Sequence, residues 1–394
     1  MTVGPRLNPV LLVLAAAALL ALLGLPFVRV APNRLVSGET VYLASMLTAP
    51  AMWLAAAPIA LAFSLVLASL SKQTRWLMAW VLAGSVCLVV GLLWLAAHYA
   101  TMNSQTVSAV ARTSLGGGFW VTVLLLLLIA NDTLRRLAAT PLQQAVAAFG
   151  VAALLGAMLA SGWCNDLSIM KEFANRADGL SAALGRHLQI VGVAMAFTLA
   201  IGLSLGWAAH ASKPVAALAF PVLNVVQTIP SIALFSLLMA PLATLAALLP
   251  ALGAFGISGV GMAPAVIALT LYGLLPVVRG TLAGLQQVSA AQTNAALALG
   301  LTPWAVLRYV TAPLALPVVL GGVRTAAVTT VGLAAVTALI GAGGLGGIMF
   351  EGLFSNAQDV VLLGVLPIIA LGVLMDGLLG AAISLAVRQA RPHA

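Results

Sequence analysis

The stretch that decides how this chain is organised is a polar interruption between two long apolar runs. Residues 279–314 read RGTLAGLQQVSAAQTNAALALGLTPWAVLRYVTAPL, and they separate the apolar runs 262–278 and 315–340. Connections between packed helices usually take about 2–8 residues. This connection takes 36 residues, and a connection of that length is expected to have structure of its own.

Two helices are predicted within this connection. Residues 286–299 are rich in alanine, the strongest helix former, and Gly300 suits the end of a helix. Thr302 followed by Pro303 is a typical N-cap and first-turn pair, which would start a second helix over residues 303–311. The pattern predicts a helix, a turn and a helix at the cytoplasmic face, a shape suited to docking on another protein.

The composition places most of the surface in lipid. The 394 residues are 63% hydrophobic and 6% charged, with a mean hydropathy of +1.15, whereas soluble domains carry about 25% charged residues. Two cysteines make no disulfide framework. The net charge of +9 is scattered between apolar runs, which favours a role in membrane orientation over nucleic-acid binding.

The apolar runs are continuous rather than alternating, which predicts transmembrane helices. A span needs about 20 residues, and the first run is longer than the core of a signal peptide, about 7–15 residues, so it is expected to be an uncleaved span. Segment 241–261 is broken by prolines and glycines and is expected to be re-entrant or interfacial. We predict an all-α polytopic membrane protein with about ten transmembrane helices, at 10–31, 48–70, 76–98, 117–133, 141–162, 187–210, 215–240, 262–278, 315–340 and 361–387.

The cations predict the orientation. With the N-terminus inside, the inner connections hold ten of the 17 lysines and arginines, the outer ones hold six, and Arg324 falls within a span. Positive residues concentrate on the cytoplasmic side, so both termini are expected inside. The polar stretch 163–186 is expected to be a periplasmic connection between an N-terminal bundle of about five helices, 1–162, and a second unit, 187–390.

The connecting element resembles the EAA loop of ABC importer permeases. That motif is Glu-Ala-Ala, three residues, Gly, nine residues, Ile, one residue and Leu-Pro; here Asn294, Ala295, Ala296, Gly300, Val310 and Pro313 have its spacing. Asn294 stands where the family has Glu, and Ala312 where it has Leu. The departure at Asn294 removes one charged contact with the ATPase that the resemblance implies.

Further motifs in order narrow the resemblance to osmoprotectant permeases of the glycine betaine and choline type. Residues 227–234 (QTIPSIAL), 271–279 (LYGLLPVVR), 322–326 (GVRTA) and 339–346 (LIGAGGLG) are similar to runs of that family. The resemblance covers about residues 185–390, and the extra N-terminal spans look like the Yeh-type betaine permeases. It implies a five-helix C-terminal permease core with coupling helices at about 283–312.

The resemblance also implies the partners. Cytoplasmic ABC ATPase subunits would bind the coupling helices, a periplasmic binding protein would deliver substrate, and a second permease copy or a paralogue would complete the path in the bacterial inner membrane. ATP hydrolysis would lie on a partner chain, so neither catalytic residues nor cofactors nor metals are expected on this one. The residues expected to couple to the ATPase are Asn294, Ala295, Ala296, Gly300, Trp304, Arg308 and Pro313.

A second set of residues is expected to line the translocation path or its gate. Polar residues surround the proline break in the run 215–240, two ionisable groups lie within spans, and a glycine-rich turn follows another span; the set is Gln227, Thr228, Pro230, Ser231, Arg324, Asp376, Gly343 and Gly344. Charges within membranes usually face cavities or partners. For Arg324, the alternatives are a bond to Asp376 and snorkelling to the membrane surface. For the proline break, the alternative to lining the path is kinked packing at Pro230. For the glycine-rich turn, the alternative to a gate is a simple flexible turn.

Other function classes explain less of the sequence. A stand-alone secondary transporter would need intramembrane ionisable groups for coupling, and only Arg324 and Asp376 are available. The four histidines show no HExxH spacing for a membrane metalloenzyme. Importers of amino acids such as methionine, of taurine or of nitrate share the EAA spacing and remain the alternatives for substrate.

Overall fold

The computed structural model describes residues 8–33, 38–46, 56–71, 74–106, 111–138, 140–254 and 257–390. The chain divides into two compact units between Asn175 and Arg176. Helix α7, Ser168–Ala211, carries the chain from the first unit into the second.

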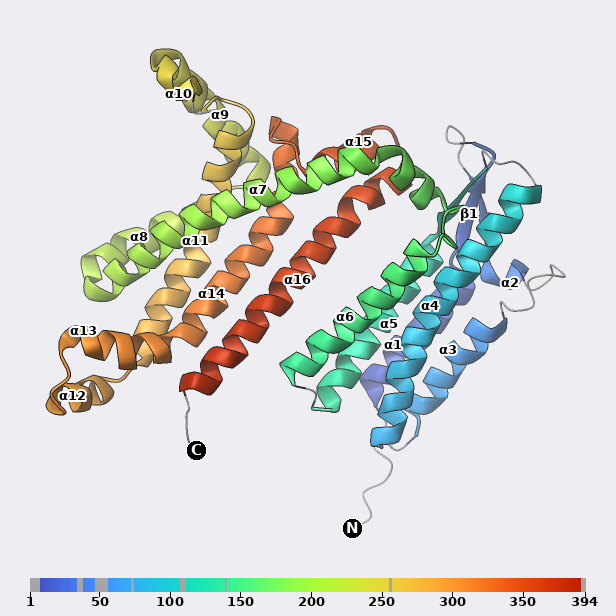
Figure 1. The fold of residues 1–394 in the computed structure, drawn as a ribbon, viewed down its shortest axis with the longest axis horizontal. Coiled ribbons are helices and arrows are strands. Elements are labelled where there is room, and N and C mark those ends of the chain that lie inside the picture. The colour runs from blue at the N-terminus through green and yellow to red at the C-terminus, as the bar shows by residue number, and fades with distance from the viewer. Residues whose placement is uncertain are drawn as a thin grey trace, which may run out of the picture. The chain divides into compact units, whose positions relative to one another are not determined.

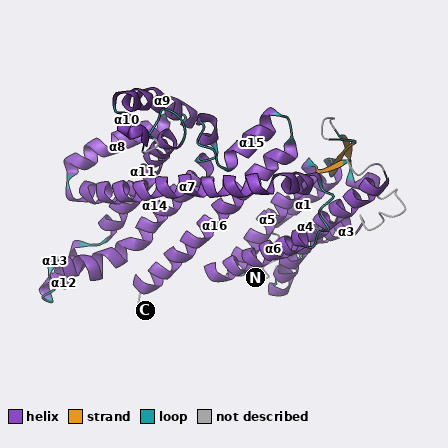
Figure 2. Ribbon diagram, turned by 45° about the horizontal axis from the view of Figure 1, so that its top comes forward, coloured by secondary structure: helices purple, strands orange, loops and turns teal. Residues whose placement is uncertain are grey.

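The N-terminal unit is a helical bundle with a small sheet at one end (Figure 2). Its first helix starts where the Asn8 side chain accepts a hydrogen bond from the Leu11 amide at 3.1 Å, an N-cap that the sequence encodes locally. Its helices are α1 (Pro9–Gly24), α2 (Leu43–Met46), α3 (Ala56–Ser69), α4 (Arg75–Thr106), α5 (Gly117–Arg136) and α6 (Pro141–Ala160).

Three short strands were not predicted from the sequence. They are β1 (Val28–Ala31), β2 (Glu39–Val41) and β3 (Arg112–Leu115), in the order β2–β1–β3, with both neighbouring pairs antiparallel. The expected span 10–31 is therefore wrong at its end: helix α1 stops at Gly24 and the chain continues into β1. Pro26 interrupts the apolar run, and a proline disfavours helix in the residue before it.

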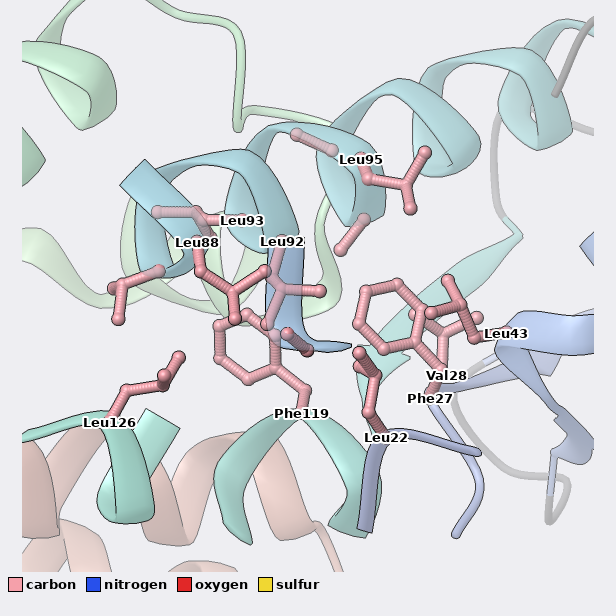
Figure 3. Packing of buried hydrophobic residues seen from close by; sticks show 14 of the residues in the cluster. Leu22, Phe27, Val28, Leu43, Leu88, Leu92, Leu93, Leu95, Phe119 and Leu126 are labelled. Atoms are coloured by element: carbon pink, nitrogen blue, oxygen red, sulfur yellow. The ribbon is translucent and has the colours of Figure 1, made fainter. Parts of the chain in front are cut away.

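The core of this unit lies where the helices meet the sheet. Phe27 and Phe119 pack edge to face with their centroids 6.2 Å apart, and leucines of α1, α4 and α5 surround them, among them Leu22, Leu92 and Leu126 (Figure 3). All five side chains are buried. The contact of α1 with α5 and of α4 with α5 therefore rests on apolar packing of long side chains.

The second unit is built around one central helix, α11. Helices α8, α9 and α14 contact α11, and α16 contacts α14 and α15 (Figure 1). Its elements after α7 are α8 (Lys213–Thr228), α9 (Ser231–Leu248), α10 (Pro250–Ala254), α11 (Met262–Gln287), α12 (Ala290–Ala298), α13 (Pro303–Val306), α14 (Ala312–Leu333), α15 (Leu345–Phe354) and α16 (Gln358–Ala390).

Within the described residues, seven helices are long and apolar enough to cross a membrane, and shorter apolar helices, α1, α3 and α15 among them, accompany them. The expected all-α polytopic class is confirmed; the figure of about ten spans and the N-in, C-in orientation stay predictions. Residues 48–55 of the expected span 48–70 lie outside the described residues.

Several expected boundaries were wrong, and prolines or packing explain them. The expected span 215–240 is two helices, because Pro230 separates α8 from α9. Helix α7 begins at Ser168, so most of the polar stretch 163–186 is helical rather than a loop. The expected span 315–340 ends as an α-helix at Leu333, and a 3-10 turn covers Val336–Ile340.

Candidate functional site

The predicted helix-turn-helix is present, and local capping builds it. Its first helix is Ala290–Ala298 rather than the expected 286–299, because α11 continues to Gln287 and Ser289 starts a new helix. At the start of α12, the Ser289 hydroxyl accepts from the Gln292 amide at 3.3 Å, and the Gln292 side chain accepts from the Ser289 amide at 3.0 Å, which is a capping box. Gly300 ends the helix with φ +85°, and the amide of Leu301 donates to the Ala296 carbonyl at 3.3 Å. This left-handed closure needs glycine at position 300.

The second helix of the element is continuous with a membrane span. Thr302 caps α13 by accepting from the Ala305 amide at 3.2 Å, and Pro303 occupies the first turn. A π-helical segment, Leu307–Thr311, then joins α13 to α14 without a break. The chain from α13 to α14 is therefore one continuous helix, and α14 packs on the central helix α11.

The outer surface of this helix-turn-helix is apolar and exposed. Leu299, Trp304 and Tyr309 have 84%, 68% and 67% of their surface exposed, while Ala296 and Val306 are buried. Arg308 lies over the ring of Tyr309, with its guanidinium carbon 5.8 Å from the ring centroid. Of the predicted coupling residues, Asn294, Ala295, Gly300, Trp304 and Arg308 are exposed, Pro313 is partly buried and Ala296 is buried between the helices.

The proline break between α8 and α9 is held by hydrogen bonds to α11. Gln227 donates its amide to the Tyr272 carbonyl at 2.6 Å, and the Tyr272 hydroxyl donates to the Ile229 carbonyl. The Thr228 hydroxyl donates to the Val225 carbonyl of its own helix at 2.7 Å. The structure thus brings Gln227 to Tyr272, a partner that the sequence did not suggest, and leaves Pro230 exposed and Ser231 partly buried at the break.

Arg324 and Asp376 form a two-pronged ion pair between α14 and α16, which confirms the hypothesis that they bond. The Arg324 Nε and Nη2 atoms each donate to one oxygen of the Asp376 carboxylate at 2.5 Å. Their side chains remain 39% and 46% exposed. A single charge at the centre of a membrane helix costs about 2.5–3.5 kcal/mol on insertion scales, so mutual pairing is what allows both residues to be present there.

The glycine-rich turn after α14 is tied to α7 by two residues that sequence reasoning did not single out. Gly343 and Gly344 have positive φ, both +82°. The Arg186 Nε atom donates to the Ala342 carbonyl at 3.0 Å, and the buried His187 ring packs against Gly344 with its Nε2 atom 3.2 Å from the Val331 carbonyl. The sequence signal that could have identified them is the adjacent pair Arg186 and His187 at the start of the apolar run 187–210.

Among the described residues, no three His, Cys, Asp or Glu side chains gather where they would hold a metal ion. Several ionisable groups of the second unit instead bond other side chains or backbone carbonyls. Arg176 and Glu351, for example, form an ion pair at 2.8 Å between α7 and α15. The candidate functional features of this unit are thus an exposed helix-turn-helix at one end of α11 and α14 and polar contacts within and beyond their spans (Figure 1).

Two family models match the chain, one for each unit. Residues 6–170 match the N-terminal domain of the ABC transporter permease YehY. Residues 198–383 match the inner membrane component of binding-protein-dependent transport systems. Together with the seven candidate spans, these matches define a multi-pass membrane permease, a transport subunit rather than an enzyme.

Relatives of known class specify the family. The chain is 37% identical over 205 residues to the osmoprotectant import permease OsmW of Salmonella typhimurium, covering 52% of this chain and 90% of that protein. It is 34% identical to the carnitine transport permease OpuCD of Listeria monocytogenes (50% of this chain, 81% of that protein). It is 32% identical to the glycine betaine/carnitine/choline permease OpuCB of Bacillus subtilis (49% and 81%). The chain belongs to the osmoprotectant permease family of ABC importers.

A solved structure is also similar to part of this chain. The inward-facing MetNI methionine ABC transporter matches with a TM-score of 0.40 and 22% identity, covering 51% of this chain and 95% of that chain.

Proposed function

We propose that this permease imports glycine betaine or a related quaternary-ammonium osmoprotectant, driven by ATP hydrolysis on a cytoplasmic ATPase that docks on α12 and α13. The observation that carries the proposal is the exposed apolar surface of that helix-turn-helix, continuous with the membrane helix α14. Exposed apolar patches of this kind mark protein interaction sites. Their continuity with a span supplies the mechanical link that coupling needs.

The chemistry of the docking surface is specific. Arg308 is the only charged residue between Arg279 and Arg324, and Asn294 replaces the family's acid. The contact with the ATPase therefore rests on Leu299, Trp304 and Tyr309 inserting into an apolar groove. Arg308 pairs with an acidic residue of the ATPase. Pro313 lies in the first turn of α14, where the membrane span follows the docking surface.

The remaining partners follow from the same proposal. A periplasmic binding protein delivers the substrate, and two permease copies, or this chain and a paralogue, form the path in the inner membrane with both termini in the cytoplasm. The chain itself needs no cofactor, because the ATPase performs the chemistry. The path and its gate include the proline break at Gln227, Thr228, Pro230 and Ser231, the pair Arg324–Asp376, and the turn at Gly343 and Gly344.

The test is uptake of labelled glycine betaine into proteoliposomes that contain the permease, its co-purifying ATPase and its binding protein, with ATP inside or outside. Uptake that requires ATP on the ATPase side supports the proposal. Uptake without any ATPase would make the chain a secondary transporter. ATP-dependent uptake of an amino acid or taurine, with none of betaine, would keep the importer and overturn the substrate.

The docking surface is tested with a matched pair of tryptophans. Trp304→Ala removes a 68% exposed ring from the docking element, and Trp76→Ala removes an 88% exposed ring from α4 of the N-terminal unit. We expect Trp304→Ala to reduce co-purification of the ATPase at least tenfold and Trp76→Ala to leave it unchanged. Equal co-purification of both variants would contradict docking at α13.

A further inference from the structure

The ion pair of Arg324 and Asp376 lies near the middle of both helices that carry it. Arg324 is twelve residues beyond the start of α14 at Ala312 and nine residues before its end at Leu333. Asp376 is eighteen residues beyond the start of α16 at Gln358 and fourteen residues before its end at Ala390. At about 1.5 Å per residue, each charge is at least about 13 Å from either end of its helix.

The pair is not enclosed by its own unit. With side chains 39% and 46% exposed, the two groups open onto the outer surface of α14 and α16, and lipid is a poor solvent for them. The same part of α14 also exposes Thr325, Thr329 and Gly332. On α16 the exposed neighbours of Asp376 are apolar, namely Val373, Leu374 and Leu378. The polar side of the opening is therefore the α14 face, whose hydroxyls and glycine are suited to a water-filled path rather than to hydrocarbon.

Two small residues adjoin the pair. Gly380 lies one turn after Asp376 on α16, where a Cβ atom would be 3.6 Å from the Arg324 guanidinium carbon, an ordinary van der Waals contact. Thr325 follows Arg324 on α14, and its hydroxyl donates to the Gly321 carbonyl at 3.1 Å. Residue 380 therefore places no side chain against the guanidinium.

Resting on the proposed function, we infer that Arg324 and Asp376 form an exchangeable site for a zwitterion in the translocation path. Glycine betaine and carnitine each carry one carboxylate and one quaternary ammonium. The substrate carboxylate replaces Asp376 on the Arg324 guanidinium, and the released Asp376 carboxylate faces the ammonium. Four charges then alternate in sign and the site stays neutral, which a low-dielectric environment demands.

The same count of charges disfavours binding of a plain cation at this site. Choline has the ammonium without the carboxylate, so it adds an uncompensated positive charge beside Arg324. Removing the arginine charge reverses this preference, because Asp376 then has no partner and attracts any cation. The pair would therefore set the charge class of the substrate, with zwitterions preferred over cations.

The experiment measures the ratio of glycine betaine to choline uptake in proteoliposomes at concentrations that saturate the same binding protein. We expect Arg324→Gln to lower this ratio at least tenfold relative to the unaltered permease, whether by loss of betaine uptake or by appearance of choline uptake. Arg388→Gln, an exposed arginine in the last turn of α16, is the matched control and should leave the ratio unchanged.

A second variant covers the case in which Arg324→Gln leaves Asp376 unpaired and the complex fails to assemble. Arg324→Gln with Asp376→Asn carries no unpaired charge, and its ratio is also expected to fall at least tenfold. A ratio equal to that of the unaltered permease in the double variant would overturn the zwitterion site. So would efficient disulfide cross-linking of Thr325→Cys between two permease copies, since the pair would then lie under a partner helix.

The two proposals fail in different ways. If the unaltered complex takes up no quaternary amine, the substrate assignment and the zwitterion site both fall. If the unaltered complex takes up betaine with ATP and the ratio is insensitive to both variants, the importer stands and only the site at Arg324 and Asp376 is overturned.

Discussion

Gly322 of α14 lies against Gly280 of α11 where the two helices cross. A Cβ atom on Gly322 would be 3.0 Å from the Gly280 Cα atom and would run into the carbonyl oxygen of Pro276. Paired glycines allow membrane helices to approach closely and pack through their backbones. This crossing fixes α14, the helix that continues from the docking element, on the central helix of its unit.

Gly322→Ala should therefore destabilise the permease, because one methyl group forces α11 and α14 apart. Overpacking of this kind costs about 1–3 kcal/mol. The neighbouring Gly321 has open space where its Cβ would be, so Gly321→Ala is the control. Thermal unfolding of the detergent-purified protein should show a lower midpoint for Gly322→Ala alone; identical midpoints would argue against this crossing.

Gly300→Val should uncouple ATP hydrolysis from transport. Gly300 has φ +85° with no atoms near its missing Cβ, so the change strains the backbone, by about 1–2 kcal/mol, without a steric clash. The turn between α12 and α13 would shift, and stimulation of ATP hydrolysis by substrate-loaded binding protein should fall several-fold.

Asparagine tolerates the left-handed conformation better than other residues, so Gly300→Asn should retain most of this stimulation. Equal loss with valine and asparagine would mean that the glycine matters for its surface rather than for its backbone conformation.

Glu172→Gln should destabilise the N-terminal unit. Glu172 is 3% exposed and lies 3.7 Å from Arg112, whose side chain is 17% exposed and whose NH1 atom is buried. Removing one partner of a buried pair typically costs about 3–5 kcal/mol. The control is Asp178→Asn, which changes an exposed acid further along α7. Limited proteolysis of the two variants measures how resistant the N-terminal unit is to cleavage in each. Unchanged protease resistance of Glu172→Gln would contradict the prediction.

The thiol of Cys164 should be unreactive in the folded protein. Cys164 lies in the turn between α6 and α7, fully buried, and burial raises the pKa of its thiol above the ordinary value. The variant Cys87→Ser leaves it as the only thiol. Maleimide labelling at neutral pH should be slow until the protein is unfolded in detergent, and rapid labelling of the folded state would show that the turn is open.

The same pKa shift gives a sign for stability against pH. The folded state holds the thiol proton more tightly than the unfolded state, so its contribution to the free energy of unfolding is full below the ordinary thiol pKa, about 8.5. That contribution declines as the pH rises beyond this value. Cys164→Ala should remove the decline, which unfolding measurements at pH 7 and pH 9.5 would detect.

Local sequence carried enough information for the class of protein and for the docking element. The Thr302 cap and the turn at Gly300 depend only on neighbouring residues, and both were found where they were expected. The Ser289 cap is equally local but was not predicted. The spacing of the EAA-like motif is likewise a property of one contiguous stretch. These features could be predicted because capping acts within a single turn of helix and the hydropathy of a span within one contiguous run of residues.

The exact limits of the spans were predicted less well. A break such as Pro230 can be read either as a kink or as the end of a helix, and only its neighbours in space decide between them. Here Gln227 and Ile229 are bonded to Tyr272 on α11, which stabilises the open turn and separates α8 from α9. The strands β1 to β3 escaped notice because three or four residues carry little periodic signal.

What the sequence by itself determined is that this chain is a multi-pass permease of a known importer family with a helix-turn-helix between two spans, since composition and contiguous motifs suffice for that. The bond between Arg324 and Asp376 was one hypothesis among several, because 52 residues separate them. Only the packing of α14 on α16 brings the two charges together. Tertiary structure likewise placed His187 against Gly344, because contacts between distant segments depend on how helices pack and not on any local run of residues.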